Sequence, residues 1–288
     1  MKLGIALSGG GIRGIAHVGV LKALEENNIS VDVIGGTSSG GLIASLYALG
    51  YSPIYIYETF KKYAGQITNV SSTPIVSGIS DFIMKRKVKL LGLKTGKSIE
   101  RICDDLAEKK GIRNVGDITS IPLVMPTVDI GNSKKYVFTN SIPEKVVNKS
   151  QYITDISLGK AIRASSSFPG VFCPCKYKEY KFLDGGILDN TPVFEVKKQG
   201  ADKVIAINFK SDDVNESSNI MDIAVRTIDI MGNKIAQESL EVSDLVLTIE
   251  TNKTGLLDVN RLEECYNYGY KETLKNIHKI KSMMDDKL

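Results

Sequence analysis

The chain has 288 residues, of which 42% are hydrophobic and 24% are charged, and its formal net charge is +4. The hydrophobic content is enough for a sizeable core, and the charged share is ordinary for a globular protein. The mild positive charge, without a clustered basic stripe, argues against a nucleic-acid binder.

No run of the sequence reaches the ~18 apolar residues that a membrane-spanning helix needs. The apolar run at residues 1–7 is too short for a signal peptide. The four cysteines are scattered, without the spacing of a zinc site or a disulfide framework. We therefore expect a reduced, cytoplasmic protein without a metal or other cofactor.

Short β-type runs alternate with helical patterns along the whole chain. The expected strands are residues 3–8, 31–35, 121–130, 135–139, 181–183, 204–209 and 245–249. The expected helices are residues 14–26, 40–49, 54–63, 99–108, 156–166, 191–199, 220–240 and 259–284. No linker or internal repeat interrupts the series, so the pattern predicts one α/β domain over residues 1–288.

The segment Gly36-Thr37-Ser38-Ser39-Gly40 stands between an expected strand and an expected helix. A G-x-S-x-G sequence in this context holds its serine at a sharp bend, where the hydroxyl projects above the sheet edge. Gly36 and Gly40 flank the bend because a Cβ there would collide with the neighbouring chain. The pattern predicts that Ser38 is a nucleophile.

A second glycine-rich turn, Gly9-Gly10-Gly11-Ile12-Arg13-Gly14, follows the first expected strand and opens a helix. Consecutive glycines leave backbone N–H groups free to face a carbonyl oxygen that gains negative charge. We expect Gly9, Gly10 and Gly11 to form such an oxyanion hole beside Ser38. Arg13 orients this loop, attracts an anionic head group, or is a plain surface cation.

The same glycine turn also matches the G-x-G-x-x-G fingerprint of dinucleotide-binding proteins. That interpretation requires an acidic residue at the end of the second strand, whereas Asp32 lies at the start of it. The second strand also runs into Gly36 and Ser38, which have no role in a dinucleotide site. The hydrolase interpretation is therefore favoured.

The general base has to be found in a chain with only two histidines, His17 and His278. Both lie within expected helices, and we interpret them as a helix-face and a surface histidine. The order Ser38, Asp184, His278 nevertheless matches the triad order of α/β-hydrolases, so a triad with His278 stays open.

The preferred base is Asp184, in Asp184-Gly185-Gly186, which follows a short expected strand. Asp129, Asp189 and Asp202 are competitors that lack this pattern. A carboxylate with a reference pKa of ~3.9 is a weak base, but burial raises its pKa. A Ser–Asp dyad of this kind favours esters and thioesters over peptide bonds.

Together these motifs resemble the patatin-like phospholipase family, serine lipid acyl hydrolases with a Ser–Asp dyad. The motifs quoted above for Gly9–Gly14, Gly36–Gly40 and Asp184–Gly186 carry the resemblance, as does the segment from Ala161 to Phe172. The resemblance covers a motif core at about residues 3–210, and residues 211–288 add helices and a strand.

The resemblance implies a three-layer α/β/α sandwich with a mostly parallel central sheet, no metal, and phospholipid or related acyl-ester substrates. It implies that Ser38 is the nucleophile, Asp184 the base and Gly9, Gly10 and Gly11 the oxyanion hole. A lysophospholipase or an acyl-thioesterase with the same dyad remains an alternative, and so does a catalytically idle scaffold that binds a partner.

Residues 84–94 mix cations with apolar side chains. Such a segment is typical of a peripheral docking element or mobile lid at an anionic membrane face, and also of a solvated helix. We therefore expect a cytoplasmic enzyme that can contact the inner membrane face.

Overall fold

The computed structural model describes residues 1–68, 95–146, 148, 151–210, 220–252, 254–255 and 258–285. The strands are β1 Leu3–Leu7, β2 Val33–Gly36, β3 Leu123–Asp129, β4 Lys134–Thr139, β5 Tyr152–Ile153, β6 Cys175–Tyr177, β7 Tyr180–Asp184, β8 Lys203–Phe209 and β9 Leu245–Ile249. The α-helices are α1 Ile15–Glu26, α2 Ser39–Ala48, α3 Pro53–Thr68, α5 Lys97–Glu108, α6 Leu158–Ser165, α7 Val193–Lys198, α8 Ile220–Glu241, α9 Leu262–Lys275 and α10 Ile277–Asp285. Short 3-10 helices are η1 Gly11–Gly14, η2 Val115–Asp117, η4 Gly185–Ile187 and η5 Val259–Arg261.

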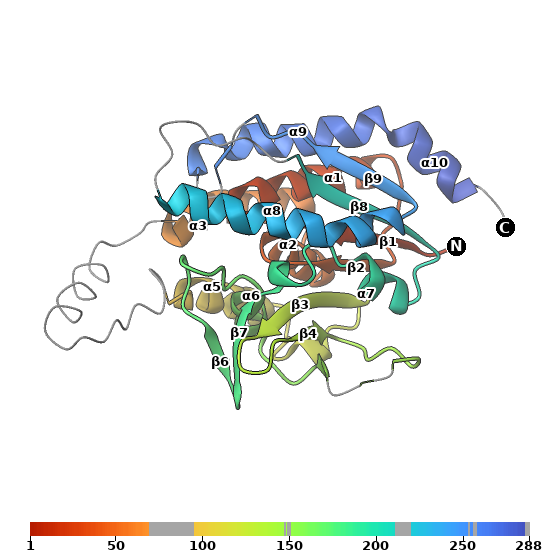
Figure 1. The fold of residues 1–288 in the computed structure, drawn as a ribbon. Helices are drawn as coiled ribbons and strands as arrows, with labels where there is room; N and C mark the ends of the chain where they lie inside the picture. Colours follow the sequence, from red (N-terminus) through yellow and green to blue (C-terminus); the bar gives the residue numbers. More distant parts are fainter. Residues whose placement is uncertain are drawn as a thin grey trace, which may run out of the picture.

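One sheet in the order β5-β4-β3-β2-β1-β8-β9 forms the centre of the molecule (Figure 1). Strands β3, β2, β1, β8 and β9, in this spatial order, run parallel to one another. Strands β4 and β7 pair with β3 in the antiparallel sense. Strand β9 extends the sheet beyond β8, so a strand from the C-terminal part of the chain joins the motif core.

The two faces of the sheet are packed differently, because side chains alternate along each strand. Leu3, Ile5 and Leu7 of β1 face the larger core, which they share with α1, α2, α3, α5 and α6. Ala6 faces a smaller core with Val193 and Val196 of α7. Helix α8 crosses this second face in front of the strands in Figure 1. The fold is therefore the α/β/α sandwich with a mostly parallel sheet that the family resemblance implied.

Small residues on the second face allow α7 to approach the sheet closely. A Cβ on Gly4 would lie 2.4 Å from Val196 Cγ1, and one on Gly35 would lie 2.6 Å from Val196 Cγ2. Distances under 3 Å are not tolerated, so only glycine fits at these two positions. The close approach brings the loop before α7 to the end of β2.

The register of β3 explains how Ser38 and Asp184, which are far apart in the sequence, come to lie at the same level of the sheet. Val124 of β3 pairs with Gly35 of β2, and Thr127, three residues further along β3, pairs with Asp184 of β7. Because β2 ends at Gly36, β7 occupies the place that a longer β2 would have taken beside β3. Asp184 is thereby positioned at the level that residue 38 would reach if β2 continued.

Several details differ from the expected elements. The two-residue β5 and three-residue β6 were not predicted, since runs this short carry little periodic signal. The expected helix 259–284 is divided into η5, α9 and α10, with a break at Asn276, whose Nδ2 donates to the Glu272 carbonyl oxygen at 2.9 Å. Residues 84–94 lie outside the described residues. Among those described, no helix is both long and apolar enough to cross a membrane.

Candidate active site

Ser38 sits at a sharp bend between β2 and α2. Its φ of 55° and ψ of −122° lie in a region that side-chain-bearing residues rarely adopt, at a cost of about 1–3 kcal/mol. The flanking glycines permit the bend, because a Cβ on Gly36 would lie 2.3 Å from the Gly40 carbonyl and one on Gly40 would lie 2.4 Å from the Leu7 carbonyl oxygen. The predicted strand–turn–helix context of Ser38 is thus present.

Helix α6 and the residues after it hold both predicted catalytic residues by hydrogen bonds. The Ser38 backbone N–H donates to Oγ of Ser165 at 3.2 Å. The Asp184 backbone N–H donates to the carbonyl oxygen of Ser167 at 3.1 Å. The Ala161–Phe172 segment, quoted above for the family resemblance, therefore has a physical role: it holds the backbone of Ser38 and of Asp184 in place.

Asp184 is 2% exposed, and its two carboxylate oxygens differ in their surroundings. Oδ1 accepts a hydrogen bond from the Gly186 backbone N–H at 2.8 Å. Oδ2 is buried and has no hydrogen-bond partner within the described part of the chain. Burial raises the pKa of Asp184 to about 6, although the Gly186 N–H and the nearby Ser38 hydroxyl both act to lower it. The carboxyl is thus ionised at neutral pH and has one oxygen free to accept a proton.

Gly185 and Gly186 shape the turn after Asp184. A Cβ on Gly185 would lie 2.2 Å from the Pro126 carbonyl oxygen, so the backbone there passes directly against β3. A Cβ on Gly186 would lie 3.1 Å from Asp184 Oδ1 and would interfere with the N–H that supports the carboxylate. Both glycines therefore keep the carboxyl in place.

The three competing aspartates are engaged elsewhere. Asp129 Oδ1 accepts from the Lys181 N–H at 2.8 Å, and Asp202 Oδ2 accepts from the Lys2 N–H at 2.7 Å. The Asp189 carboxylate contacts Lys135 Nζ at 2.7 Å. The Ser38 hydroxyl is among the groups that influence the pKa of the Asp184 carboxyl.

The first glycine loop lies beside Ser38, because a Cβ on Gly9 would be 3.3 Å from Ser38 Cβ. The Gly9 N–H, however, donates to the carbonyl oxygen of Asn190 at 3.1 Å. The expectation that Gly9 supplies a free N–H is therefore corrected. Within the described residues, the N–H groups of Gly10 and Gly11 have no hydrogen-bond partner, and Gly11 has the positive φ of 59° that turns the loop.

Arg13 and Gly14 fix the loop from behind. Arg13 is 4% exposed, its Nε donates to the Gly10 carbonyl oxygen at 3.2 Å, and its guanidinium lies over the Phe209 ring at 5.4 Å. It orients the loop and is not a surface cation. Gly14 faces α2, since a Cβ there would lie 2.4 Å from Ser39 Oγ.

Neither histidine is arranged as a base. His17 is fully buried in α1, with Nε2 2.8 Å from the Ser8 carbonyl oxygen, and burial lowers its pKa to about 4. It supports the residue before the glycine loop. His278 is exposed on α10, as expected of a surface histidine.

A family model described as patatin-like phospholipase matches residues 5–197. The chain belongs to the patatin-like phospholipase family. The resemblance that the motifs indicated is confirmed.

Curated relatives include proteins named lysophospholipase NTE1. The one from Scheffersomyces stipitis is 33% identical over 227 residues, which are 76% of this chain and 12% of the relative. The one from Candida albicans is 31% identical over 271 residues, 91% of this chain and 17% of the relative. The chain thus spans less than a fifth of the length of these relatives.

Among solved structures, VipD from Legionella pneumophila superposes with a TM-score of 0.52 at 14% identity, over 96% of this chain and 67% of that one. This similarity supports the shared fold.

The structure does not support a dinucleotide site, because the acidic residue that would hold the ribose, Asp32, is engaged elsewhere. Asp32 Oδ2 accepts a hydrogen bond from the Leu3 backbone N–H at 2.8 Å, at the start of β2 and away from the glycine loop. Within the described residues, no group of three or more His, Cys, Asp or Glu side chains is arranged to hold a metal ion.

Sequence reasoning missed Asn190. Its Oδ1 lies where a Cβ on Gly9 or on Gly186 would collide, at 2.7 and 2.9 Å, so the amide stands between the glycine loop and the base loop. Gly232 of α8 packs against Asn190, because a Cβ built on Gly232 would lie 3.9 Å from Asn190 Cβ. A signal was available in the sequence, because Asn190 follows Asp184 by only six residues.

Proposed function

We propose that this chain hydrolyses acyl esters of phospholipids or related lipids, with Ser38 as nucleophile and Asp184 as general base. The observation that carries the proposal is the buried, partner-free Oδ2 of Asp184, in a carboxyl whose pKa the Ser38 hydroxyl influences. A carboxyl with a pKa of about 6 is ionised at neutral pH, yet it is more basic than an exposed aspartate.

In the first half of the reaction, Ser38 Oγ attacks the ester carbonyl carbon while its proton moves to Asp184 Oδ2. The carbonyl oxygen becomes an oxyanion, and the N–H groups of Gly10 and Gly11 are the donors available to it. Each such donor typically contributes about 3 kcal/mol to the transition state. Helix α2 begins at Ser39, so the positive end of its dipole also favours negative charge here.

Collapse of the tetrahedral intermediate breaks the bond to the alkoxy leaving group, which takes the proton from Asp184 and departs as an alcohol. In the second half, Asp184 accepts a proton from water, and the resulting hydroxide attacks the acyl-serine. The fatty acid leaves and Ser38 regains its proton. A carboxylic acid with a pKa of about 6 protonates an alkoxide readily, so esters are better substrates than amides.

An apolar cavity beside α2 supports an acyl substrate. It is lined by Leu42, Leu46, Thr59, Phe60, Tyr63, Ile99, Ile102, Cys103 and Leu106. Leu42 is one helical turn from the nucleophile, and its N–H donates to the Ser38 carbonyl oxygen at 3.0 Å. The apolar lining of this small cavity, about 20 Å³, suits contact with part of a hydrocarbon chain. The name of the curated relatives makes a lysophospholipid the first substrate to test.

The decisive experiment combines a fluorophosphonate probe with a lipid panel. Labelling is expected at Ser38 and lost in Ser38→Ala, and fatty acid release from lysophospholipid or phospholipid is expected from the wild type alone. Absence of labelling with intact folding would contradict the proposal. Faster turnover of acyl-thioesters than of any lipid ester would assign the same dyad to a thioesterase. His278→Ala serves as the control that keeps full activity.

Peripheral membrane contact through residues 84–94 stays a prediction, as does the cytoplasmic location. Neutralising Lys85, Arg86 and Lys87 together is expected to weaken binding to anionic vesicles while sparing turnover of a soluble ester. Unchanged vesicle binding would contradict the docking role. We also propose that residues 1–288 form one catalytic domain, which the pairing of β9 with β8 supports.

A further inference from the structure

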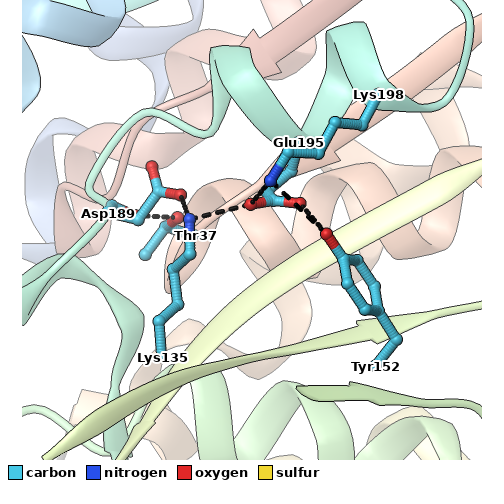
Figure 2. Close-up of polar contacts among 6 residues, drawn as sticks. All are labelled: Thr37, Lys135, Tyr152, Asp189, Glu195 and Lys198. Carbon is cyan, nitrogen blue, oxygen red and sulfur yellow. Dashed lines mark hydrogen bonds and ion pairs between the residues drawn. The ribbon is translucent and has the colours of Figure 1, made fainter. Parts of the chain in front are cut away.

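Figure 2 shows a network of charged and polar side chains that includes Thr37, the residue before the proposed nucleophile. Lys135 Nζ lies between two carboxylates, 2.7 Å from Asp189 Oδ2 and 2.8 Å from Glu195 Oε1. Glu195 also accepts from the Tyr152 hydroxyl at 2.7 Å and from Lys198 Nζ at 3.0 Å. The lysine comes from β4, Glu195 from α7, and Asp189 from the loop that joins the base to α7.

Both carboxylates are removed from solvent, with side chains that are 5% exposed at Asp189 and 1% at Glu195. Buried charges are retained only when they are paired, and losing one partner is strongly destabilising. Burial alone would lower the pKa of Lys135, but Asp189 and Glu195 outweigh it and raise the pKa. Lys135 therefore stays protonated between the two acids. Burial still raises the pKa of Asp189, although Lys135 acts to lower it, whereas Glu195 has Lys198 as a second cation.

The backbone at Asp189 touches the proposed catalytic parts. Its carbonyl oxygen accepts from Thr37 Oγ1 at 2.7 Å, directly before the nucleophile. Its N–H donates to the Gly185 carbonyl oxygen at 2.8 Å, directly after the base. The next carbonyl oxygen, that of Asn190, accepts from the Gly9 N–H. Two adjacent residues thus connect the serine turn, the base loop and the glycine loop.

We propose that Lys135 is a positioning residue, which anchors the Asp189 carboxylate so that the 185–190 loop holds Ser38, Asp184 and the glycine loop in their relative places. This inference rests on the proposed function of Ser38 and Asp184. Lys135 contacts neither of them and acts through Asp189. Its place in β4 is opposite Val128 of β3, so the same hairpin that carries Thr127 also supplies the anchor.

Two arms of the network can be separated by substitution. Asp189→Asn removes the charge that faces Lys135 but keeps the backbone contacts, and it leaves Lys135 paired with Glu195. Lys135→Met removes the anchor from both acids. Lys198→Met is the matched control, because Lys198 makes direct contacts with Glu195 and Tyr152 and acts on Asp189 only through its charge at longer range.

The test measures kcat and KM for a soluble p-nitrophenyl ester, the rate of fluorophosphonate labelling at Ser38, and the melting temperature. Small misplacements of catalytic groups cost up to about 100-fold in rate. Lys135→Met and Asp189→Asn are therefore expected to lower kcat and the labelling rate by about 10-fold or more, with KM within about twofold. Lys198→Met is expected to stay within about twofold in all three kinetic quantities.

A folded Asp189→Asn protein with the wild-type labelling rate and kcat would overturn the inference, even if Lys135→Met failed to fold. An equal loss in Lys198→Met would also overturn it, because general destabilisation would then explain the effect. A wild type that is not labelled at Ser38 would instead refute the proposed function, so the two failures are distinguishable.

Discussion

The backbone N–H of Ser38 donates a hydrogen bond to the side-chain oxygen of Ser165, which lies 127 residues further along the chain. Ser165 Oγ donates in turn to the Pro126 carbonyl oxygen at 2.7 Å. Pro126 precedes Thr127, the residue of β3 that pairs with Asp184. One hydroxyl therefore connects the strained serine turn to β3, the strand that pairs with the proposed base.

Ser165→Ala is expected to lower kcat for a soluble ester by about 10-fold, because the Ser38 turn loses its connection to β3. The unfolding free energy is expected to fall by about 1–3 kcal/mol, since a buried carbonyl and a buried N–H lose their partner. Ser45→Ala is the control. Ser45 is also a buried serine. Its hydroxyl bonds to the Gly41 carbonyl oxygen within α2 and to Met125 Sδ of β3, so it contacts the same strand from a place outside the Ser38 turn. A kcat loss in Ser45→Ala as large as in Ser165→Ala would contradict the specific role.

Asp184→Asn is expected to abolish ester turnover and at the same time to stabilise the fold. The amide oxygen can still accept the Gly186 N–H, while the cost of burying an ionised carboxylate disappears. The pKa of Asp184 is raised from 3.8 to about 6, so the ionised group lowers stability at neutral pH by at most about 3 kcal/mol.

The stability difference between wild type and Asp184→Asn depends on pH in a defined direction. Below about pH 4 the carboxyl is protonated in both the folded and unfolded wild type, so the difference is small. It grows as pH rises from 4 to 6 and is constant above that. Denaturant unfolding at pH 4 and pH 8 measures it. A wild type that gains stability over the variant as pH rises would contradict the raised pKa.

The rate is expected to depend on a single group on the acid side. For a soluble ester, kcat/KM should fall about tenfold per pH unit below pH 6 and stay level above it, because only the ionised Asp184 accepts a proton. His17→Gln and His278→Ala should keep this acid limb, the fall of kcat/KM below pH 6. His17 has a pKa of about 4, and His278 is exposed on α10. Loss of the limb in either folded variant would assign it to a histidine.

Two variants of the proposed nucleophile, both expected to be inactive, should differ in stability. Ser38→Ala keeps a Cβ at a φ of 55°, whereas Ser38→Gly adopts this conformation freely. After the larger entropy of glycine in the unfolded chain is subtracted, Ser38→Gly is expected to be more stable by about 1 kcal/mol. Thermal or chemical unfolding measures the difference. Equal stabilities would mean that the bend stores no strain.

Much of the fold follows from local patterns. The alternation of buried runs and amphipathic helices is strong enough to predict β1, β8, β9 and the β3–β4 hairpin nearly to the residue. The three glycine motifs can be recognised in the sequence because glycine is needed wherever two backbone segments touch. A Cβ at Gly36, Gly40 or Gly185 would collide with a neighbouring backbone. Their mutual approach follows from strand ends that meet at one sheet edge.

The remainder depends on distant pairings that carry no local signal. The bond from Gly9 N–H to Asn190 is made by backbone atoms that any residue possesses, so the free donors of the loop could not be identified beforehand. The cluster around Lys135 joins residues from β4, β5 and α7, which are brought together only by the sheet order. Asp189 therefore looked like a competing base, although its carboxylate faces a lysine.

The pairing of Val124 with Gly35 and of Thr127 with Asp184 has an evolutionary consequence. The separation of Ser38 and Asp184 across the sheet depends on three consecutive residue steps of β3, and not on the length of chain between them. Loops on either side of that strand can therefore gain or lose residues while this separation is kept, which leaves natural selection free to remodel the surroundings of the proposed dyad.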